Sequence, residues 1–90
     1  MTGWIDWNLA LDMRGGPNWA NNFVDSAVIV NSKTQEFYKQ PMFYALGHFS
    51  KFITEGSKRV HLGRQRGPSG LKVVSFMRPD QAVVTVVFNE

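Results

Sequence analysis

Cysteine is absent from this chain of 90 residues, which excludes a disulfide framework and any metal site built on thiolates. Apolar runs are also short, and none approaches the roughly 20 consecutive residues that a membrane-spanning helix needs. The first residues carry neither the basic start nor the apolar stretch of a secretory leader. No targeting signal is therefore expected within the chain, which leaves a cytoplasmic protein or a sequence whose natural start lies further upstream.

The composition is that of a globular protein with an uneven distribution of charge. Hydrophobic residues make up 43% and aromatic residues 13% of the chain, values typical of a packed domain. Residues 1–50 carry three basic and four acidic groups, whereas residues 51–90 carry seven basic and three acidic groups. The basic cluster of the second half consists of Lys58, Arg59, Arg64 and Arg66, with His61 among them. Such a cluster suits a nucleic acid or an anionic membrane surface, but without interleaved aromatic residues it is more typical of a solvated strand edge.

The first half of the chain shows a strand, a chain break and a hairpin. Residues 3–11, "GWIDWNLAL", predict a buried strand that ends near Asp12. Gly15-Gly16-Pro17 then breaks the chain, and residues 18–23 are predicted to form a loop or a single helical turn. The sequence "AVIVNSKTQEFYK", from residue 27, predicts a hairpin with its turn at residues 31–34.

A helix and a group of strands are predicted for the rest. "PMFYALGHFSKFI" predicts a helix over residues 41–53, with proline at its first position and an apolar stripe at helical spacing. "RVHL", "LKVVSFM" and "AVVTVVF" predict strands, the last two joined by a type I turn at Pro79-Asp80. The final strand is apolar on both faces and therefore needs cover on both sides.

These elements do not make one closed architecture. A strand followed by a long loop and a helix is the repeating unit of a (β/α)-barrel, which needs about 250 residues. The antiparallel strands that follow are typical of a separate sandwich. The sequence therefore predicts parts of two domains that meet near Gly56.

All three tryptophans lie within residues 3–19. Trp4 and Trp7 stand on either side of Asp6, and Trp19 follows the Gly-Gly-Pro turn. Aromatic rings concentrated in this way serve either a hydrophobic core or a platform for a flat polar ligand such as a sugar.

The same segment carries a resemblance to a known family. The strings "GWIDWNLAL", "GGPNW", "NFVDS" and "FYKQPMFYALGHFSKFI", in this order and spacing, resemble glycoside hydrolase family 30, and within it the glucosylceramidases. The resemblance extends over nearly the whole chain, to "VVTVVFN". It implies a fold of class α/β plus β. Residues 1–56 would form the last strand and helix of a (β/α)8 barrel, and residues 57–90 an incomplete accessory β-sandwich of antiparallel strands.

The activity that this resemblance implies is the retaining hydrolysis of glucosylceramide to glucose and ceramide. Retaining glycosidases use two carboxyl groups about 5–5.5 Å apart, one as nucleophile and one as acid/base. In this family both are glutamates on earlier barrel strands. Glu36, Glu55 and Glu90 match neither motif, so no catalytic residue is assigned here and the chain alone is expected to be inactive. No metal or cofactor is implied.

The resemblance also implies three substrate-binding residues. Trp7 matches a tryptophan at the floor of the glucose site, Asn22 an asparagine that binds a glucose hydroxyl, and Asp6 an aspartate that lines the pocket. Each has a structural alternative, because Trp7 and Asn22 could serve the core and a carboxylate at Asp6 could order the barrel mouth through hydrogen bonds. Successive side chains on a regular strand point to opposite faces of the sheet, so a regular strand would not direct both Asp6 and Trp7 into one pocket. Trp4 and Trp19 are interpreted as packing residues.

The implied surroundings are a lysosomal, membrane-associated parent with anionic lipid and a saposin C-type activator as partners, and no nucleic acid. The sequence departs from the family pattern at Asp12-Met13-Arg14 and Asn21, at the rim of the implied pocket. Two other functions remain open: a sugar- or lipid-binding module without catalysis, and another family 30 specificity such as a glucanase or xylanase. A basic nucleic-acid-binding domain ranks last.

Overall fold

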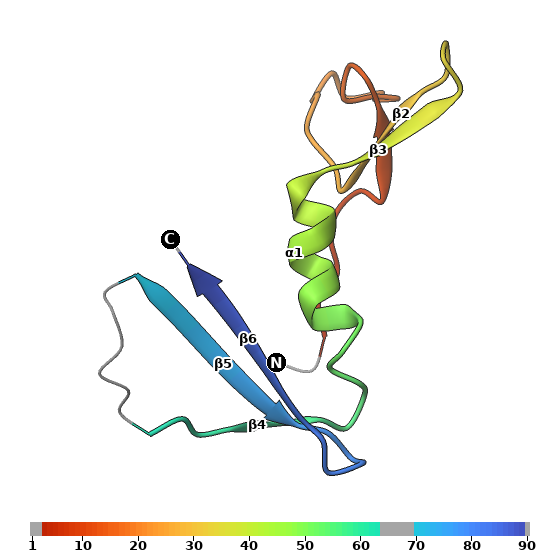
Figure 1. Cartoon of the computed structure of the whole chain (residues 1–90). Coiled ribbons are helices and arrows are strands. Elements are labelled where there is room, and N and C mark those ends of the chain that lie inside the picture. Colours follow the sequence, from red (N-terminus) through yellow and green to blue (C-terminus); the bar gives the residue numbers. More distant parts are fainter. Residues whose placement is uncertain (1–2, 64–69, 90) are drawn as a thin grey trace. The chain divides into compact units, whose positions relative to one another are not determined.

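The computed structural model describes residues 3–63 and 70–89. Along these residues the chain forms one helix and six strands in the order β1, β2, β3, α1, β4, β5 and β6 (Figure 1). The chain divides into two compact units, Met1–Leu46 and Gly47–Glu90. Each unit contains one small sheet.

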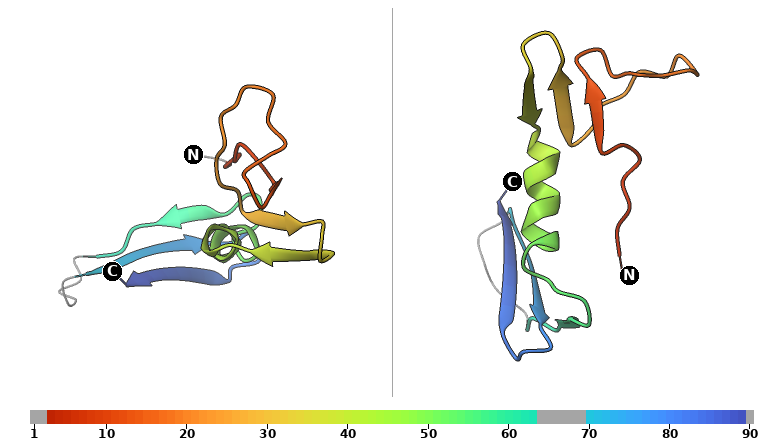
Figure 2. Two further views of the ribbon diagram at one scale, coloured as in Figure 1. Left: turned by 90° about the horizontal axis from the view of Figure 1, so that it is seen from above. Right: turned by 90° about the vertical axis from the view of Figure 1, so that its right-hand side faces the viewer.

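The first unit is built on a three-stranded sheet of order β1-β2-β3. β1 (Ala10–Asp12) runs parallel to β2 (Val28–Asn31), and β2 pairs antiparallel with β3 (Glu36–Lys39). Figure 2 shows the three strands side by side and the long loop that joins β1 to β2. Leu11 and Ala27 are the only apolar residues buried in the described part of the chain, each with 7% of its surface exposed.

The hairpin predicted between residues 27 and 39 is confirmed. Asn31 lies opposite Glu36 at the end of the ladder, and the Asn31 side chain accepts a hydrogen bond from the backbone N–H of Lys33 at 3.2 Å. Gln35 closes the turn with a φ of 56°, in the left-handed region. A polar turn between two apolar runs was sufficient to predict this pairing because hairpin contacts are local.

The strand predicted over residues 3–11 is wrong in its extent and its burial. Only Ala10–Asp12 forms a strand, and the residues before it are irregular and exposed, with Ile5 at 95% and Trp7 at 91%. A strand buried on both faces needs hydrogen-bonded neighbours and cover, and within residues 3–12 only β1 pairs with another strand. β1 pairs in parallel with β2, whereas residues 3–9 belong to no strand.

The helix α1 (Pro41–Ser50) begins at the predicted proline and ends three residues before the predicted end. Two further bonds of helical spacing, Lys51 N–H to Gly47 O and Ile53 N–H to Phe49 O, continue past the assigned end as turns. No residue of α1 is buried, so the apolar stripe that predicted this helix is present but uncovered.

The second unit contains an antiparallel sheet of order β4-β5-β6. Its strands are β4 (Lys58–Val60), β5 (Leu71–Met77) and β6 (Val83–Asn89). The predicted turn at Pro79-Asp80 is confirmed: Arg78 N–H donates to Ala82 O at 2.8 Å, and Gln81 N–H donates to Arg78 O at 3.0 Å. The strand predicted from "RVHL" forms β4, which begins one residue earlier and ends two residues earlier than predicted. Arg64 and Arg66 of the basic cluster lie outside the described residues.

Both faces of the β5–β6 pair are apolar, as predicted. Phe76 lies opposite Val84, and Val73 lies opposite Val87 on the other face. Ser75 and Thr85 form a polar pair in the middle, with their hydroxyl oxygens 2.8 Å apart and Ser75 buried to 2% exposure. Val83 and Val87 keep 60% and 57% of their surfaces exposed, so this sheet lacks the cover that its sequence calls for.

Candidate functional site

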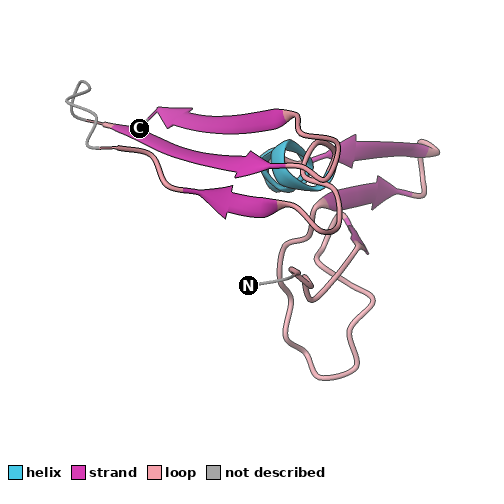
Figure 3. Ribbon diagram, turned by 90° about the horizontal axis from the view of Figure 1, so that it is seen from below, coloured by secondary structure: helices cyan, strands magenta, loops and turns pink. Residues whose placement is uncertain are grey.

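The loop between β1 and β2 carries one of the predicted site residues and is held by its own hydrogen bonds. Figure 3 shows it as an uninterrupted loop. It begins with Asp12, whose carboxylate oxygen Oδ1 accepts from the backbone N–H groups of Arg14 at 2.8 Å and Gly16 at 2.9 Å. The backbone closes the same turn, since Gly15 N–H donates to Asp12 O at 3.0 Å and Asp12 N–H donates to Gly16 O at 2.6 Å. Asp12 thus fastens the Gly-Gly turn to the end of β1.

Gly15 brings the outgoing and returning arms of this loop together. Its φ is +80°, and a Cβ placed on it would lie 2.5 Å from the backbone oxygen of Val24. Any side chain would therefore collide with main chain in a conformation that L-residues already disfavour. The arms can approach this closely only with glycine at this position.

Asn18 organises the middle of the loop. Its Oδ1 accepts from the backbone N–H of Ala20 at 2.8 Å and of Asn22 at 3.1 Å. Its Nδ2 donates to the backbone oxygen of Asn22. One side chain therefore engages both backbone polar groups of Asn22.

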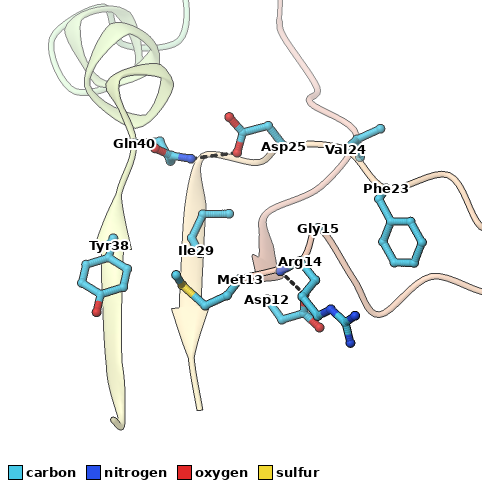
Figure 4. Close-up of a pocket in the computed structure, with 10 residues that line it drawn as sticks. All are labelled: Asp12, Met13, Arg14, Gly15, Phe23, Val24, Asp25, Ile29, Tyr38 and Gln40. Carbon is cyan, nitrogen blue, oxygen red and sulfur yellow. Dashed lines mark hydrogen bonds between the residues drawn. The ribbon is translucent and has the colours of Figure 1, made fainter. Parts of the chain in front are cut away.

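The loop returns to the sheet through Asp25 and Gln40. The Asp25 carboxylate accepts from the backbone N–H of Ser26 at 2.8 Å. It also accepts from Nε2 of Gln40 at 2.8 Å (Figure 4). Gln40 N–H also donates to Ala27 O at 3.0 Å, so the end of β3 is bonded to the start of β2. Ser26 Oγ donates to Val28 O at 2.6 Å, which gives this buried hydroxyl a partner.

A pocket of about 510 Å³ lies between the loop and the sheet. Figure 4 shows Ile29 and Tyr38 on the strands at one side, and Arg14 and Phe23 on the loop at the other. The remaining lining residues are Asp12, Met13, Gly15, Val24, Asp25 and Gln40. The two carboxylates in this set, Asp12 and Asp25, accept backbone or amide N–H groups and thereby hold the loop together. The pocket offers polar and aromatic contacts.

The electrostatics of the loop centre on Asp12. The backbone N–H groups of Gly16 and Arg14 stabilise the charged carboxylate and hold the pKa of Asp12 below its ordinary value. The turn is therefore fastened by an ionised group over the whole mildly acidic range. In the hairpin, the hydroxyls of Tyr38 and Thr34 likewise hold the pKa of Glu36 below its ordinary value.

The three predicted binding residues lie in two places. Asp6 and Trp7 are neighbours in the irregular N-terminal segment, where Asp6 Oδ1 accepts the backbone N–H of Trp7 at 2.8 Å. Asn22 lies in the loop after β1 and is exposed. Among the described residues no hydrogen bond joins Asn22 to Asp6 or Trp7, and neither pocket at the loop is lined by any of the three. The strand alternation that would separate Asp6 from Trp7 does not apply, because this segment is not a strand.

The residues that sequence reasoning missed are those that build the loop. Asp12 was noted only as a departure from a family pattern, and Asn18 was not singled out. A usable signal existed, because aspartate or asparagine followed within a few residues by glycine or a second asparagine is typical of side chain-to-backbone turns.

Among residues 3–63 and 70–89, no group of three or more histidine, cysteine, aspartate or glutamate side chains is placed to hold a metal ion. No helix within these ranges is long and apolar enough to cross a bilayer.

Comparison with protein families assigns both halves of the chain to one class of enzyme. Residues 1–53 match the glycosyl hydrolase family 30 TIM-barrel domain, and residues 56–90 match the glycosyl hydrolase family 30 beta sandwich domain. The chain therefore consists of part of a (β/α)8 barrel followed by part of an antiparallel β-sandwich, which confirms the predicted fold class. It belongs to glycoside hydrolase family 30.

Two individual proteins illustrate the relationship. Over 89 residues the chain is 58% identical to lysosomal acid glucosylceramidase of Mus musculus, an alignment that covers 99% of this chain and 17% of that protein. The crystal structure of SrfJ from Salmonella typhimurium superposes with a TM-score of 0.84 at 30% identity, covering 93% of this chain and 18% of SrfJ. The chain thus spans about a sixth of the length of the relatives that it matches. The predicted domain boundary between residues 56 and 57 stays a prediction.

Proposed function

We propose that this chain is part of a β-glucosidase that hydrolyses glucosylceramide to glucose and ceramide with retention of configuration. The observation that carries the proposal is the 58% identity to a lysosomal acid glucosylceramidase across 99% of this chain. That stretch includes the exposed tryptophan segment and the whole loop after β1. The nucleophile and the acid/base are assigned to glutamates outside these 90 residues.

In this proposal the chain supplies part of the sugar-binding surface. The indole of Trp7, 91% exposed, is free to pack its face against the C–H bonds of glucose. The bond from Trp7 N–H to the Asp6 carboxylate fixes the backbone between the two residues. Asn22 offers an amide for a glucose hydroxyl. Hydrogen bonds that strengthen in the transition state are a recognised source of glycosidase rate enhancement.

The location and partners follow from the same proposal. A lysosomal parent is supported by the name of the mouse relative, lysosomal acid glucosylceramidase. Anionic membrane lipid and a saposin C-type activator are proposed as partners. The exposed side chains of Lys58 and Arg59 on β4 supply positive charge that an anionic surface would attract.

The experiment that tests the function is a segment swap. The matching segment of the mouse relative is replaced by this chain, giving a protein that we call the swapped enzyme. We expect it to hydrolyse glucosylceramide with a kcat/KM within about tenfold of the mouse protein, because both glutamates and most of the barrel are unchanged. A folded swapped enzyme that fails on glucosylceramide but cleaves a β-glucan or xylan would replace this function with another family 30 specificity.

The swapped enzyme also tests the role of Asp12 through pH. Because the folded pKa of Asp12 is depressed, its stabilising effect is present above the ordinary aspartate value of about 3.9 and is lost as the pH falls through the folded value. Asp12→Asn should therefore lower Tm at pH 5, and this loss of Tm should shrink as the pH is lowered through the folded pKa of Asp12, where the carboxylate becomes neutral. A loss of Tm that stays the same across this acid range would show that the charge of Asp12 does not fasten the turn. Glu55→Gln, an exposed carboxylate elsewhere, is the control.

A further inference from the structure

The loop that carries Asn22 also contains Asn18, whose side chain binds the backbone of Asn22. We propose that Asn18 is a positioning residue: it fixes the backbone of Asn22 and thereby orients the Asn22 amide toward the sugar. This inference rests on the proposed function, since it presupposes that Asn22 binds glucose. Asn18 itself is not assigned any contact with the substrate.

Two of the three hydrogen bonds that the Asn18 side chain makes go to Asn22. Oδ1 accepts from Asn22 N–H at 3.1 Å as well as from Ala20 N–H at 2.8 Å, and Nδ2 donates to the backbone oxygen of Asn22. The orientation of the amide follows from its surroundings, because only an oxygen can accept from two N–H groups and only the NH₂ can donate to a carbonyl.

The backbone of Asn22 is therefore fully occupied while its side chain is available. Asn22 is exposed, and among the described residues its side-chain amide makes no hydrogen bond. Asn21, just before it, has a φ of 56°, the left-handed conformation that asparagine tolerates best after glycine. This tight turn brings both polar backbone groups of Asn22 within reach of one side chain.

The hydrogen bonds between the Asn18 side chain and the Asn22 backbone are connected to the sheet through the Gly-Gly turn. Asp12, the last residue of β1, binds the backbone N–H of Gly16, and Asn18 follows two residues later. The side chains of Asp12 and Asn18 thus form two successive links between the strand and Asn22. A shift of about 1 Å at a substrate-positioning group is enough to cost roughly 100-fold in rate, so such links have kinetic consequences.

Asn31 is a matched control, because its side chain supports a turn that carries no site residue. Asn31 also accepts a backbone N–H with its Oδ1, from Lys33 at 3.2 Å, but it does so in the β2–β3 turn and binds no site residue. Replacing Asn31 by alanine removes the same kind of bond without touching Asn22.

The test is a double-mutant cycle in the swapped enzyme with a soluble fluorogenic β-glucoside. We expect Asn22→Ala to lower kcat/KM by about 10- to 100-fold and Asn18→Ala by about tenfold, with most of the second loss in kcat. In the Asn22→Ala background, Asn18→Ala should change kcat/KM by less than about twofold, because the group that it positions is gone. Asn31→Ala should leave kcat/KM within about twofold in either background.

Two results would overturn the inference in distinguishable ways. If Asn18→Ala lowers kcat/KM equally in both backgrounds, Asn18 acts independently of Asn22, although the sugar-binding role of Asn22 stands. If Asn22→Ala has no effect, the proposed role of Asn22 fails and the positioning role falls with it. Should Asn18→Ala fail to fold, the cycle is run with Asn18→Asp, which keeps both acceptor bonds and loses the donor. Asn18→Asp should lower kcat/KM less than Asn18→Ala does, and this loss of kcat/KM must likewise disappear in the Asn22→Ala background.

Discussion

Replacing Trp7 by alanine should lower kcat/KM of the swapped enzyme toward a soluble β-glucoside by about 100-fold. Stacking of a nucleobase on an aromatic side chain is worth about 1–3 kcal/mol, and we take the packing of sugar C–H bonds on the indole to be of the same order, with lost positioning adding to the loss. The indole of Trp7 is 91% exposed, so its removal disturbs little packing among residues 3–63 and 70–89. Trp7→Phe keeps an aromatic face and should recover a large part of the activity.

Trp19 is the matched control for Trp7. It is also a tryptophan of the first unit and is 98% exposed, but it lies in the loop after the Gly-Gly-Pro turn. Trp19→Ala should stay within about threefold of the unmodified swapped enzyme. If the two alanine variants lose activity equally, or if Trp7→Ala is nearly fully active, Trp7 does not form the floor of the glucose site.

The second large effect is the absence of turnover by the 90 residues on their own. Retaining hydrolysis needs a nucleophile and a proton donor about 5–5.5 Å apart. The hydroxyls of Tyr38 and Thr34 bind the Glu36 carboxylate and lower its pKa, which favours the ionised form over a proton donor. Asp12 and Asp25 already accept backbone or amide N–H groups. We therefore expect no hydrolysis of a fluorogenic β-glucoside by the purified chain.

The isolated chain should also lack a cooperative unfolding transition. Leu11 and Ala27 are the only buried apolar residues in the described part, far fewer than an ordinary domain needs to offset its loss of conformational entropy. We expect low hydrogen-exchange protection and aggregation through the uncovered valine-rich strands β5 and β6. Saturable, inhibitor-sensitive turnover by the purified chain would contradict both expectations and direct attention to Asp6, Asp25 and Glu36.

Some elements could be predicted from the sequence because their causes are local. The hairpin at residues 31–34 and the turn at Pro79-Asp80 depend on residues a few positions apart, and both are confirmed. Pro41 marked the start of α1 for the same reason. The end of α1 was predicted less well, because helix termini fray into turns such as those at Lys51 and Ile53.

Other elements depend on pairing with strands that are distant in the sequence, and no local pattern identifies these partner strands. The segment before β1 was predicted as a strand from its apolar content, but a strand requires a hydrogen-bonding neighbour and residues 3–9 have none in the described chain. The parallel pairing of Leu11 with Ile29 joins residues on either side of a long loop, and no local pattern indicates it. In the candidate site, Trp7 and Asn22 came from a family resemblance, whereas the supporting bonds of Asp12 and Asn18 emerged only from the structure.

The hydroxyl pair of Ser75 and Thr85 gives the valine-rich hairpin a preferred alignment. Along β6, Val83, Val84, Val86 and Val87 are interchangeable, so a shifted pairing with β5 would still place apolar side chains on both faces. Any such shift would set the buried Ser75 opposite valine and leave its hydroxyl without a partner, at a cost of about 1–3 kcal/mol. Two small polar side chains thereby distinguish one pairing from alternatives of nearly equal hydrophobic energy.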